Sequence, residues 1–539
     1  MSAFLKKNWK WIARGSALVI VAVIFFLAFR VISFIGDITA PPRQSQFSTP
    51  TPDVQASVSA QALANDLFGT PTPGGTTTAA AGATAILPAL TPTPGFNSST
   101  VVQKIKNGQP ITVLLLGYGG FGHDGEWLTD TILVMRYDPK TKTILQFNIP
   151  RDLYVNAPTD GKNKGRWMKV NLVFGYIMDM DKPTDDLDAR YRWTDTKNKQ
   201  DGAANLVADT IEPVLGFQID YWATLSFEGF RKFIDSMGGV EVDVERAFVD
   251  KEYPKNDNDK VDASYITISF KAGLQKMDGE TAIRYARSRH SETPMEGGDF
   301  ARSRRQMRLI QAVKEKAVKE NLVLKSLDYM SALQGNVRFS LDFGELTSLG
   351  NYFNGEGKAL ANDIKFSSEV LNERYLADTT LPVEGYALLP KEGQGKYGAI
   401  QRWVQSVTSN ADIRREGVYV QVLNSNGTTG VASKFTDFLL DRGFRVSQEQ
   451  DSDGVREQTE IVDYSQGAAP NTIARLKSFF PNLNVKVTQL SPDKRPKNNP
   501  SEAAIQLYLG KDFKAAGITS LSQPATAGAN SQPAPTTGS

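Results

Sequence analysis

Arginine residues crowd into one segment of the chain, between residues 274 and 308. The segment reads LQKMDGETAIRYARSRHSETPMEGGDFARSRRQMR, and its arginines are Arg284, Arg287, Arg289, Arg302, Arg304, Arg305 and Arg308. A guanidinium group can donate two hydrogen bonds to one phosphate, whereas an ammonium group acts as a point charge. The arginines therefore predict a site for a phosphate-bearing anion. The alternatives are a solvated surface and a patch for nucleic acid or heparin.

Two elements are expected to position these arginines. Arg287 and Arg289 alternate along the chain, so on an extended strand both side chains would point to one face. Asp299 can cap a helix on which Arg302, Arg305 and Arg308 recur at a spacing of three residues along one side. The apolar residues of the same stretch indicate that this helix packs against a core.

Further polar residues follow a series of predicted strands. The apolar runs at 111–116, 131–137 and 143–148 predict three core strands. Arg151 and Asp152 follow the third strand within the sequence IPRD. Ligands collect at strand ends in α/β sheets, so this pair is a candidate for the site.

Lys169 and Asn171 stand in the sequence WMKVNLVFGY, and a stretch further along, at 202–215, has the apolar spacing of a helix. A lysine taken alone is usually a solvated surface residue. The acidic stretch at 179–188 lacks the glycine and the terminal glutamate of a calcium-binding loop, so we interpret it as a solvated loop.

The loop between the first two predicted strands is rich in glycine and reads GYGGFGHDGEWLTD. Gly117, Gly119 and Gly122 spell G-x-G-x-x-G, the pattern that opens a helix onto a pyrophosphate in dinucleotide-binding folds. Here another strand follows instead of a helix, which argues against a nicotinamide or flavin site. The glycines are expected to make turns or to let the backbone approach a ligand closely.

Composition excludes several classes of chemistry. The 539 residues contain no cysteine and two histidines, which excludes zinc fingers, iron–sulfur clusters, cysteine nucleophiles and multi-histidine metal centres. Lys and Arg total 61 and Asp and Glu total 59, so the formal net charge is +2. That balance argues against a protein coated with positive charge for nucleic-acid binding.

The N-terminal hundred residues predict a membrane-anchored protein. Residues 15–35 are nearly all apolar and have the length of ~20 residues that a membrane-spanning helix needs. Lys6, Lys7, Lys10 and Arg14 precede it, so the positive-inside rule places residues 1–14 in the cytoplasm. We expect an uncleaved single-pass anchor in the cell membrane, with the catalytic part extracytoplasmic. The Pro-, Thr- and Ala-rich residues 36–100 predict a disordered linker.

The rest of the chain predicts two α/β domains. We expect a catalytic domain at 101–408, with a central mixed sheet flanked by helices, and a smaller α/β domain at 415–513. The smaller domain is indicated by a strand at 418–423 and a helix at 431–442. No function can be read from its residues, and a small binding or spacing domain is the preferred interpretation. Residues 514–539 predict a disordered tail.

Several sequence pieces occur together in an order that resembles a known family. These are LLLGYGG, LTDTILVM, IPRD, KVN, GFQIDYWATLSFEGFRKFIDSMGGVEV, MDGETAIRYARSR and DFARSRRQ. In this order and at this spacing, from about residue 101 to 407, they resemble the LytR-CpsA-Psr family of cell-envelope enzymes. The piece VLNSNGTTGVA resembles the LytR C-terminal domain that is often appended to that family.

The resemblance implies a phosphotransferase that moves a glycan-1-phosphate from a polyprenyl pyrophosphate carrier onto peptidoglycan. It implies Mg²⁺ or Mn²⁺, and an apolar tunnel for the prenyl chain beside the sheet. By matching position, Asp130 would bind the metal, and Asp130, Arg151 and Asp152 would be catalytic. The implied pyrophosphate-binding residues are Arg151, Arg287, Arg289, Arg302, Arg305, Lys169 and Asn171. Asp130 or Asp152 would accept the proton of the attacking sugar hydroxyl.

One departure from the family pattern concerns the first glycine loop. Many members have an Asp-x-Arg pair directly after the LLLG strand, where this chain has Tyr118, Gly119 and Gly120. Asp124 could supply the missing carboxylate as a second metal ligand, or Asp130 could hold the ion with water and phosphate oxygens. His123 is either an additional polar group of the site or a residue that stabilises the loop.

Two other functions remain open on the sequence. The same groups could pass the pyrophosphate to water, which would make a lipid pyrophosphate hydrolase. Alternatively, the loss of the Asp-x-Arg pair could leave a non-catalytic, membrane-anchored regulator or glycan-binding protein. The sequence does not identify the glycopolymer or the acceptor hydroxyl.

Overall fold

The computed structural model describes residues 101–513, apart from 161–164, 195–197, 257–261, 321–335, 342–344, 346–347, 350–351, 353–354, 448–449, 453 and 497–502. The predicted cytoplasmic segment, membrane helix, linker and C-terminal tail lie outside the described residues. No helix among the described residues is long and apolar enough to cross a membrane. These residues form two compact units, 101–405 and 406–513, and the division falls within helix α12 (Gly398–Ser409).

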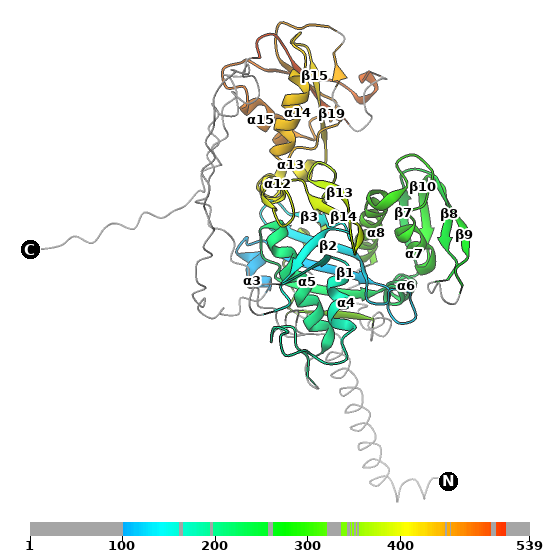
Figure 1. The fold of residues 1–539 in the computed structure, drawn as a ribbon. Coiled ribbons are helices and arrows are strands. Elements are labelled where there is room, and N and C mark those ends of the chain that lie inside the picture. Colours follow the sequence, from blue (N-terminus) through cyan, green and yellow to red (C-terminus); the bar gives the residue numbers. More distant parts are fainter. Residues whose placement is uncertain are drawn as a thin grey trace, which may run out of the picture. The chain divides into compact units, whose positions relative to one another are not determined.

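The first unit is built on a mixed sheet (Figure 1). In the described residues its strand order is β11-β6-β1-β2-β3-β12. The strands are β1 (Ile111–Tyr118), β2 (Thr129–Asp138), β3 (Thr143–Asn148), β6 (Tyr221–Ser226), β11 (Val337–Phe339) and β12 (Lys365–Val370). β1 pairs antiparallel with β2 and parallel with β6, while β3 pairs parallel with β12. The predicted central mixed sheet is therefore confirmed, as are its first three strands.

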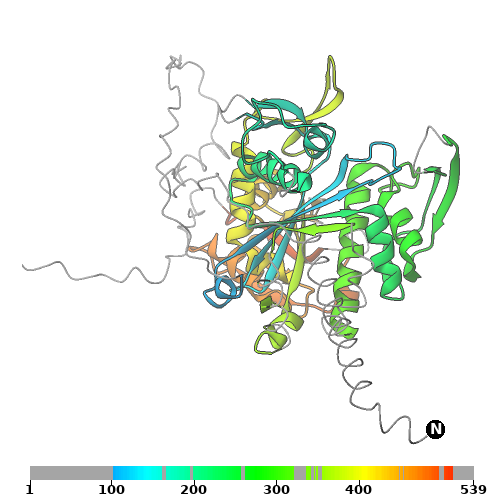
Figure 2. The same cartoon turned by 90° about the horizontal axis from the view of Figure 1, so that it is seen from below.

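The two faces of this sheet differ. On β1, Leu114, Leu116 and Tyr118 are almost fully buried, whereas Val113 and Leu115 on the opposite face are only partly buried. Helices α4 (Leu172–Met178) and α5 (Lys199–Leu215) lie on the first face, and α8 (Gly298–Glu320) lies on the second (Figure 2). On the two central strands this second face carries apolar side chains, of which Val113 and Leu115 are partly buried and Leu133 is fully buried.

The remaining described elements of the first unit are helices and short strand pairs outside the six-stranded sheet. The helices are α3 (Val101–Lys106), α6 (Phe227–Ser236), α7 (Gly279–Arg287) and α11 (Lys358–Asp363). The short strands form four pairs, which are β4 (Tyr154–Ala157) with β5 (Arg166–Lys169), β7 (Val240–Val244) with β10 (Gly273–Met277), β8 (Phe248–Pro254) with β9 (Tyr265–Phe270), and β13 (Leu376–Leu381) with β14 (Gly385–Pro390).

In the first unit one predicted helix is found, and the arginine segment differs from its prediction at two places. The predicted helix at 202–215 is confirmed as most of α5, which begins after the N-cap Asn198. The predicted strand through Arg287 and Arg289 is wrong, because Arg287 is the last residue of α7. Asp278 caps α7 by accepting a hydrogen bond from the Thr281 N–H at 2.8 Å, and the helix buries Ala282 and Tyr285. Helix α8 begins at Gly298, one residue before the predicted cap Asp299.

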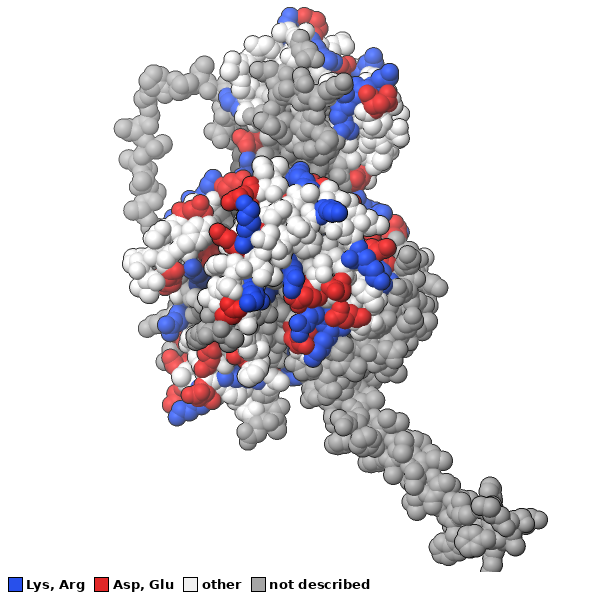
Figure 3. All heavy atoms as spheres, turned by 90° about the vertical axis from the view of Figure 1, so that its right-hand side faces the viewer, with Lys and Arg blue, Asp and Glu red and all other residues white. Residues whose placement is uncertain are grey.

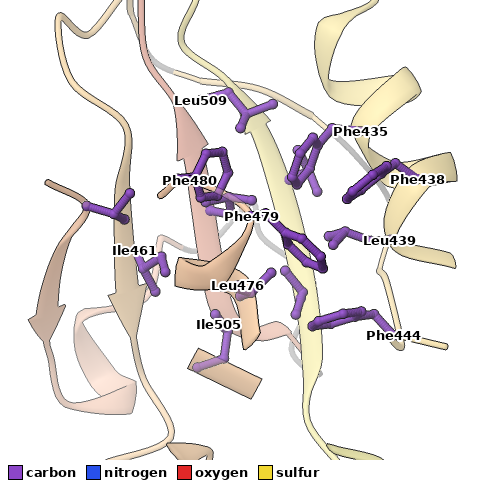
Figure 4. Packing of buried hydrophobic residues seen from close by; sticks show 14 of the residues in the cluster. Phe435, Phe438, Leu439, Phe444, Ile461, Leu476, Phe479, Phe480, Ile505 and Leu509 are labelled. Carbon is purple, nitrogen blue, oxygen red and sulfur yellow. The ribbon is translucent and has the colours of Figure 1, made fainter. Parts of the chain in front are cut away.

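The second unit is a smaller α/β fold, as predicted. Its described strands have the order β16-β15-β19-β17-β18 and comprise β15 (Tyr419–Asn424), β16 (Gln450–Asp451), β17 (Glu460–Asp463), β18 (Lys486–Gln489) and β19 (Ala503–Leu509). Helices α13 (Ala411–Glu416), α14 (Val431–Asp441) and α15 (Pro470–Ser478) and the short 3₁₀ helix η2 (Pro492–Lys494) complete it. Phenylalanines fill the core between the sheet and α14 (Figure 4).

Candidate active site

The candidate site forms around Asp130 at the start of β2. The register of β1 and β2 pairs Gly117 with Thr131 and Tyr118 with Thr129, so Asp130 is the extra residue of a β-bulge. A bulge leaves one residue unpaired and changes the direction of its side chain. The irregular pairing explains how a carboxylate can leave the sheet at this edge.

Four predicted residues form a line of alternating charges here. Asp130 Oδ1 accepts a hydrogen bond from Arg151 Nη1 at 2.9 Å. Arg151 Nε lies 3.4 Å from Asp152 Oδ2, and Lys169 Nζ lies 3.3 Å from Asp152 Oδ1. The structure therefore brings together the predicted residues of the LTD, IPRD and KVN sequences.

Asp130 is held in its ionised form. Burial disfavours the charged carboxylate, but the positive charges of Arg151, Arg302 and Arg289 outweigh that effect and hold its pKa below the usual value. Three cations thus face one carboxylate, and the site carries an excess of positive charge. Such an excess suits a ligand with several negative charges.

Helix α8 contacts the same part of β2. Arg302 Nη2 donates to the carbonyl oxygen of Asp130 at 3.4 Å. One turn further along, Gln306 Nε2 donates to Thr131 Oγ1 at 3.0 Å. The sequence analysis did not select Gln306, although its place four residues after Arg302 puts both on one helix face.

Arg287 meets the glycine loop at His123. Arg287 Nη2 lies 3.0 Å from His123 Nε2, and His123 Nδ1 lies 2.5 Å from the carbonyl oxygen of Asp124. Because that carbonyl oxygen can only accept, Nδ1 carries the proton and Nε2 accepts from the arginine. A Cβ at Gly119 would lie 2.6 Å from the histidine ring, so only glycine leaves room for it. His123 therefore both contacts a predicted site residue and folds the loop.

Arg305 is placed differently from the other predicted arginines. Its side chain is 3% exposed, and it donates to the carbonyl oxygens of Tyr285 at 3.0 Å, of Glu296 at 3.0 Å and of Ser288. Its Nη1 also pairs with Glu296 Oε2 at 2.8 Å. The structure does not bring the Arg305 guanidinium to Asp130, and its predicted contact with pyrophosphate stays a prediction.

Asn171 follows β5 and is tied to the site through its backbone. It accepts from the Thr129 N–H at 3.1 Å and donates to the Arg151 carbonyl oxygen at 3.2 Å. Its side chain is buried, does not cap α4, and leaves Oδ1 without a hydrogen bond in the described structure. The structure therefore places Asn171 beside the site, and the predicted contact of its side chain with pyrophosphate stays a prediction.

The residues present fit a divalent ion only in part. Asp130 Oδ2 accepts no hydrogen bond from the described residues, so this oxygen can face a cation. Asp124 is exposed, and its predicted role as a second metal ligand stays a prediction. Within the described ranges, no three residues of the His, Cys, Asp and Glu types gather in a group that could hold a metal. Mg²⁺ tolerates one or two carboxylates when water and phosphate oxygens complete its shell.

The charged side chains on one face of the molecule are of both signs (Figure 3). On the face shown in Figure 3, basic and acidic side chains are interspersed among the coloured residues. The described arginines of the 274–308 segment also include surface ion pairs, such as Arg284 with Glu280 and Arg308 with Glu245. This arrangement does not favour the alternative of a nucleic-acid patch.

Comparison with known protein families agrees with this geometry. The model of the LytR_cpsA_psr family matches residues 81–382, which is more than half of the chain. The chain belongs to the LytR-CpsA-Psr family. A second family model, the LytR cell envelope-related transcriptional attenuator, matches residues 417–513. The family resemblance inferred from the sequence is thereby confirmed for both parts.

Relatives of this LytR-CpsA-Psr chain carry two kinds of name. It is 26% identical over 273 residues to the polyisoprenyl-teichoic acid–peptidoglycan teichoic acid transferase TagU of Bacillus licheniformis, covering 50% of this chain and 73% of that protein. It is 28% identical over 274 residues to the regulatory protein MsrR of Staphylococcus aureus, covering 50% and 69%. Among solved structures, TagV of B. subtilis is 23% identical, with 57% of this chain and 98% of that chain covered and a TM-score of 0.39.

The departure of this LytR-CpsA-Psr chain has a structural consequence. Tyr118 replaces the first charged position and points into the core, where it stacks on Trp127 with ring centroids 5.6 Å apart. Its hydroxyl accepts from Gln200 Nε2 at 3.0 Å. The position therefore contributes packing rather than charge, and the Arg287–His123 contact is the polar feature that this loop adds.

Proposed function

We propose that this chain transfers a glycan-1-phosphate from a polyprenyl pyrophosphate carrier to peptidoglycan during assembly of the cell envelope. The observation that carries the proposal is the convergence of Asp130, Arg151 and Arg302 at one sheet edge. Membership of the LytR-CpsA-Psr family and the printed activity of the relative TagU support it. Residues 15–35 would anchor the chain in the cell membrane, with the catalytic unit on the extracytoplasmic side.

The apolar sheet face offers a place for the prenyl chain. It begins beside the site at Gly117 and Thr131 and continues along Leu115 and Val113. Its far end is closed by an apolar cluster that includes Ile111. A carrier lipid lying on this face would present its pyrophosphate to Asp130 and the arginines.

The reaction needs positioning and charge neutralisation more than a protein nucleophile. A sugar hydroxyl of peptidoglycan attacks the glycan-proximal phosphorus in line. The new P–O bond forms as the bond to the second phosphate breaks, and polyprenyl phosphate leaves with the electron pair. Arg151, Arg302, Arg287 and Arg289 would neutralise the phosphate oxygens. Asp130 or Asp152 would accept the hydroxyl proton.

We include a divalent ion, Mg²⁺ or Mn²⁺, in this proposal, with Asp130 and Asp124 as its protein ligands. When bound, such an ion would neutralise charge on the pyrophosphate. Asp152 is already engaged by Arg151 and Lys169, which supports a role in fixing both cations at the site.

A second candidate is a non-catalytic regulator or binder of lipid-linked glycan. The buried Tyr118 favours it, because the family's Asp-x-Arg charges are absent from this loop. The relative MsrR is named a regulatory protein, which supports this second candidate. A hydrolase that passes the pyrophosphate to water would use the same groups.

The test is a transfer assay with the full-length chain in detergent. The chain would be mixed with a polyprenyl pyrophosphate-linked oligosaccharide, Mg²⁺ and soluble peptidoglycan fragments, and the products analysed by mass spectrometry. A phosphodiester-linked product that is lost in Arg287→Ala supports the transferase. The matched control is Arg284→Ala on the same helix, whose arginine pairs with Glu280 at the surface. Free glycan phosphate alone would indicate the hydrolase, and intact substrate bound to the protein would indicate the binder.

A further inference from the structure

The chain turns sharply where α7 ends, and this turn carries two of the predicted phosphate-binding arginines. Arg287 is the last residue of α7, Ser288 is its C-cap, and Arg289 follows. Ser288 is only 1% exposed, so the two arginines leave the backbone on either side of a buried residue. The direction of their side chains depends on how rigidly this turn is held.

A buried carboxylate holds the turn from one side. Asp250 on β8 has no exposed surface, and its Oδ2 accepts from Ser288 Oγ at 2.6 Å, the Arg289 N–H at 3.1 Å and the His290 N–H at 3.2 Å. Its Oδ1 accepts from the Glu252 N–H at 3.0 Å. Asp250 forms no ion pair within the described structure, so hydrogen-bond donors alone stabilise its charge.

The guanidinium of Arg305 holds the same turn from its carbonyl side. It donates to the carbonyl oxygen of Tyr285, in the last turn of α7, and to that of Ser288, the C-cap of the same helix. Glu296 pairs with Arg305 and fixes the position of the guanidinium. The Gly298 N–H adds a hydrogen bond of 2.7 Å to the Arg289 carbonyl oxygen.

Strand β8 also supports one of the arginines directly. The Arg287 guanidinium lies 5.8 Å from the ring centre of Tyr253 on this strand and 4.7 Å from that of Phe227. Such cation–π contacts hold a guanidinium plane over a ring. β8 therefore positions both the backbone of the turn and one of its side chains.

A buried carboxylate is stabilised only when hydrogen-bond donors or cations surround it, so the four donors around Asp250 tie its position to that of the turn. We propose that Asp250 and Arg305 are positioning residues that clamp the turn from opposite sides and aim Arg287 and Arg289 at the pyrophosphate. This assignment rests on the proposed function, and it gives Arg305 a role without contact to the substrate.

The test measures binding rather than turnover. The affinity of the full-length chain for farnesyl pyrophosphate with Mg²⁺ would be measured by calorimetry for the wild type, Asp250→Asn, Arg289→Ala and the double variant. Asparagine presents N–H groups to the backbone donors, so Asp250→Asn should weaken binding about tenfold, since hydrogen bonds to charged groups are strong. If Asp250 acts through the arginines of the turn, the double variant should lose less affinity than the sum of the losses in the two single variants.

The matched control is Asp278→Asn, because Asp278 caps the other end of the same helix and does not touch the turn. It should bind like the wild type. A folded Asp250→Asn variant with wild-type affinity, or fully additive losses in the double variant, would overturn the proposal.

Ser288→Ala covers the case in which Asp250→Asn does not fold. This change removes only the 2.6 Å hydrogen bond and should weaken binding about threefold, in keeping with a single hydrogen bond. Wild-type affinity in that variant would contradict the proposal. A wild type that binds the probe but transfers nothing would refute the proposed function alone, whereas a wild type that does not bind it would refute both.

Discussion

The two units of this protein use their interiors in different ways. In the first unit, buried or partly buried charges from distant parts of the sequence meet at one sheet edge, as Asp130 does with Arg151 and Arg302. In the second unit, the core is a cluster of aromatic and aliphatic side chains that includes Phe435, Phe479 and Phe480. The second unit also buries a carboxylate, Asp463. Unlike Asp130, it accepts hydrogen bonds from backbone N–H groups close to it in the sequence, those of Ser465 and Gly467.

This difference affects the free energy of folding of each unit. Placing charges in a protein interior costs free energy that imperfect pairing does not fully restore. A cluster of charges from distant segments is therefore a reason to look for function. A core of packed rings lowers the free energy of the folded state without such a cost. We expect substitutions in the second unit to affect mainly stability and those at Asp130 to affect mainly transfer.

The largest effect is expected in the aromatic core. Phe435 is 1% exposed, and its ring contacts those of Phe438, Phe480 and Phe513. Phe435→Ala should lower the free energy of unfolding of the second unit by about 3–5 kcal/mol, because it leaves a cavity. No tryptophan occurs after Trp403, so urea unfolding can be followed for the first unit by tryptophan fluorescence and for both by far-UV circular dichroism.

The dichroism transition should shift while the fluorescence transition stays in place. Phe121→Ala is the control, since this ring is 98% exposed and its loss should change stability by no more than about 0.5 kcal/mol. Equal shifts of both transitions would show that the units do not unfold separately. That result would contradict the distinction drawn between the two units.

A smaller change in free energy but a specific loss of activity is expected at Asp130. Asp130→Asn keeps the shape of the side chain and removes its charge. Transfer should fall about 100- to 1,000-fold, in the range seen when one group that stabilises transition-state charge is removed. The free energy of unfolding should change by about 1 kcal/mol or less, because the Asp130–Arg151 pair is partly exposed.

Product formation by mass spectrometry and thermal unfolding would measure both quantities. Asp138→Asn is the matched control at the other end of β2, where the carboxylate accepts from Lys140 and Thr141 at the surface. It should transfer like the wild type. Full activity in Asp130→Asn would remove this residue from the proposed mechanism.

The smallest effect concerns the pH dependence of stability in the first unit. Burial disfavours ionisation of Asp250, but the Ser288 hydroxyl and the backbone N–H groups of Glu252, His290 and Arg289 hold its pKa below the usual value. An unfolded aspartate has a pKa of about 3.9. The stabilisation is therefore present above that pH and is lost as the pH falls through the lower pKa of the folded state.

Acid unfolding followed by tryptophan fluorescence would check this expectation. Asp250→Asn should make the free energy of unfolding less dependent on pH below about 4, because the variant cannot bind the proton. An acid transition as steep as that of the wild type would show that the charge of Asp250 does not stabilise the fold.

Much of the site could be predicted because the family pattern and the residue chemistry are local in the sequence. The sequences LTD, IPRD and DFARSRRQ supplied Asp130, Arg151 and Arg302, and hydrophobic patterns supplied the first strands and most of α5. The roles of Asp250 and Glu296 could not be predicted in this way. A lone acidic residue on a short strand has no sequence signal that separates a buried clamp from a surface charge.

The sequence by itself determined which groups are present, namely arginines suited to phosphate, carboxylates at strand ends and no thiol chemistry. It also determined the strand and helix patterns that carry them, because those depend on the spacing of apolar residues. The tertiary structure decided which arginines face Asp130. It also decided that Arg305 instead donates its hydrogen bonds to backbone carbonyl oxygens. It also turned the expected strand at Arg287 and Arg289 into a helix end and a clamped turn. The physical reason is that hydrogen bonds between segments far apart in the chain, such as those that the turn donates to Asp250, depend on distances in space that local spacing does not encode.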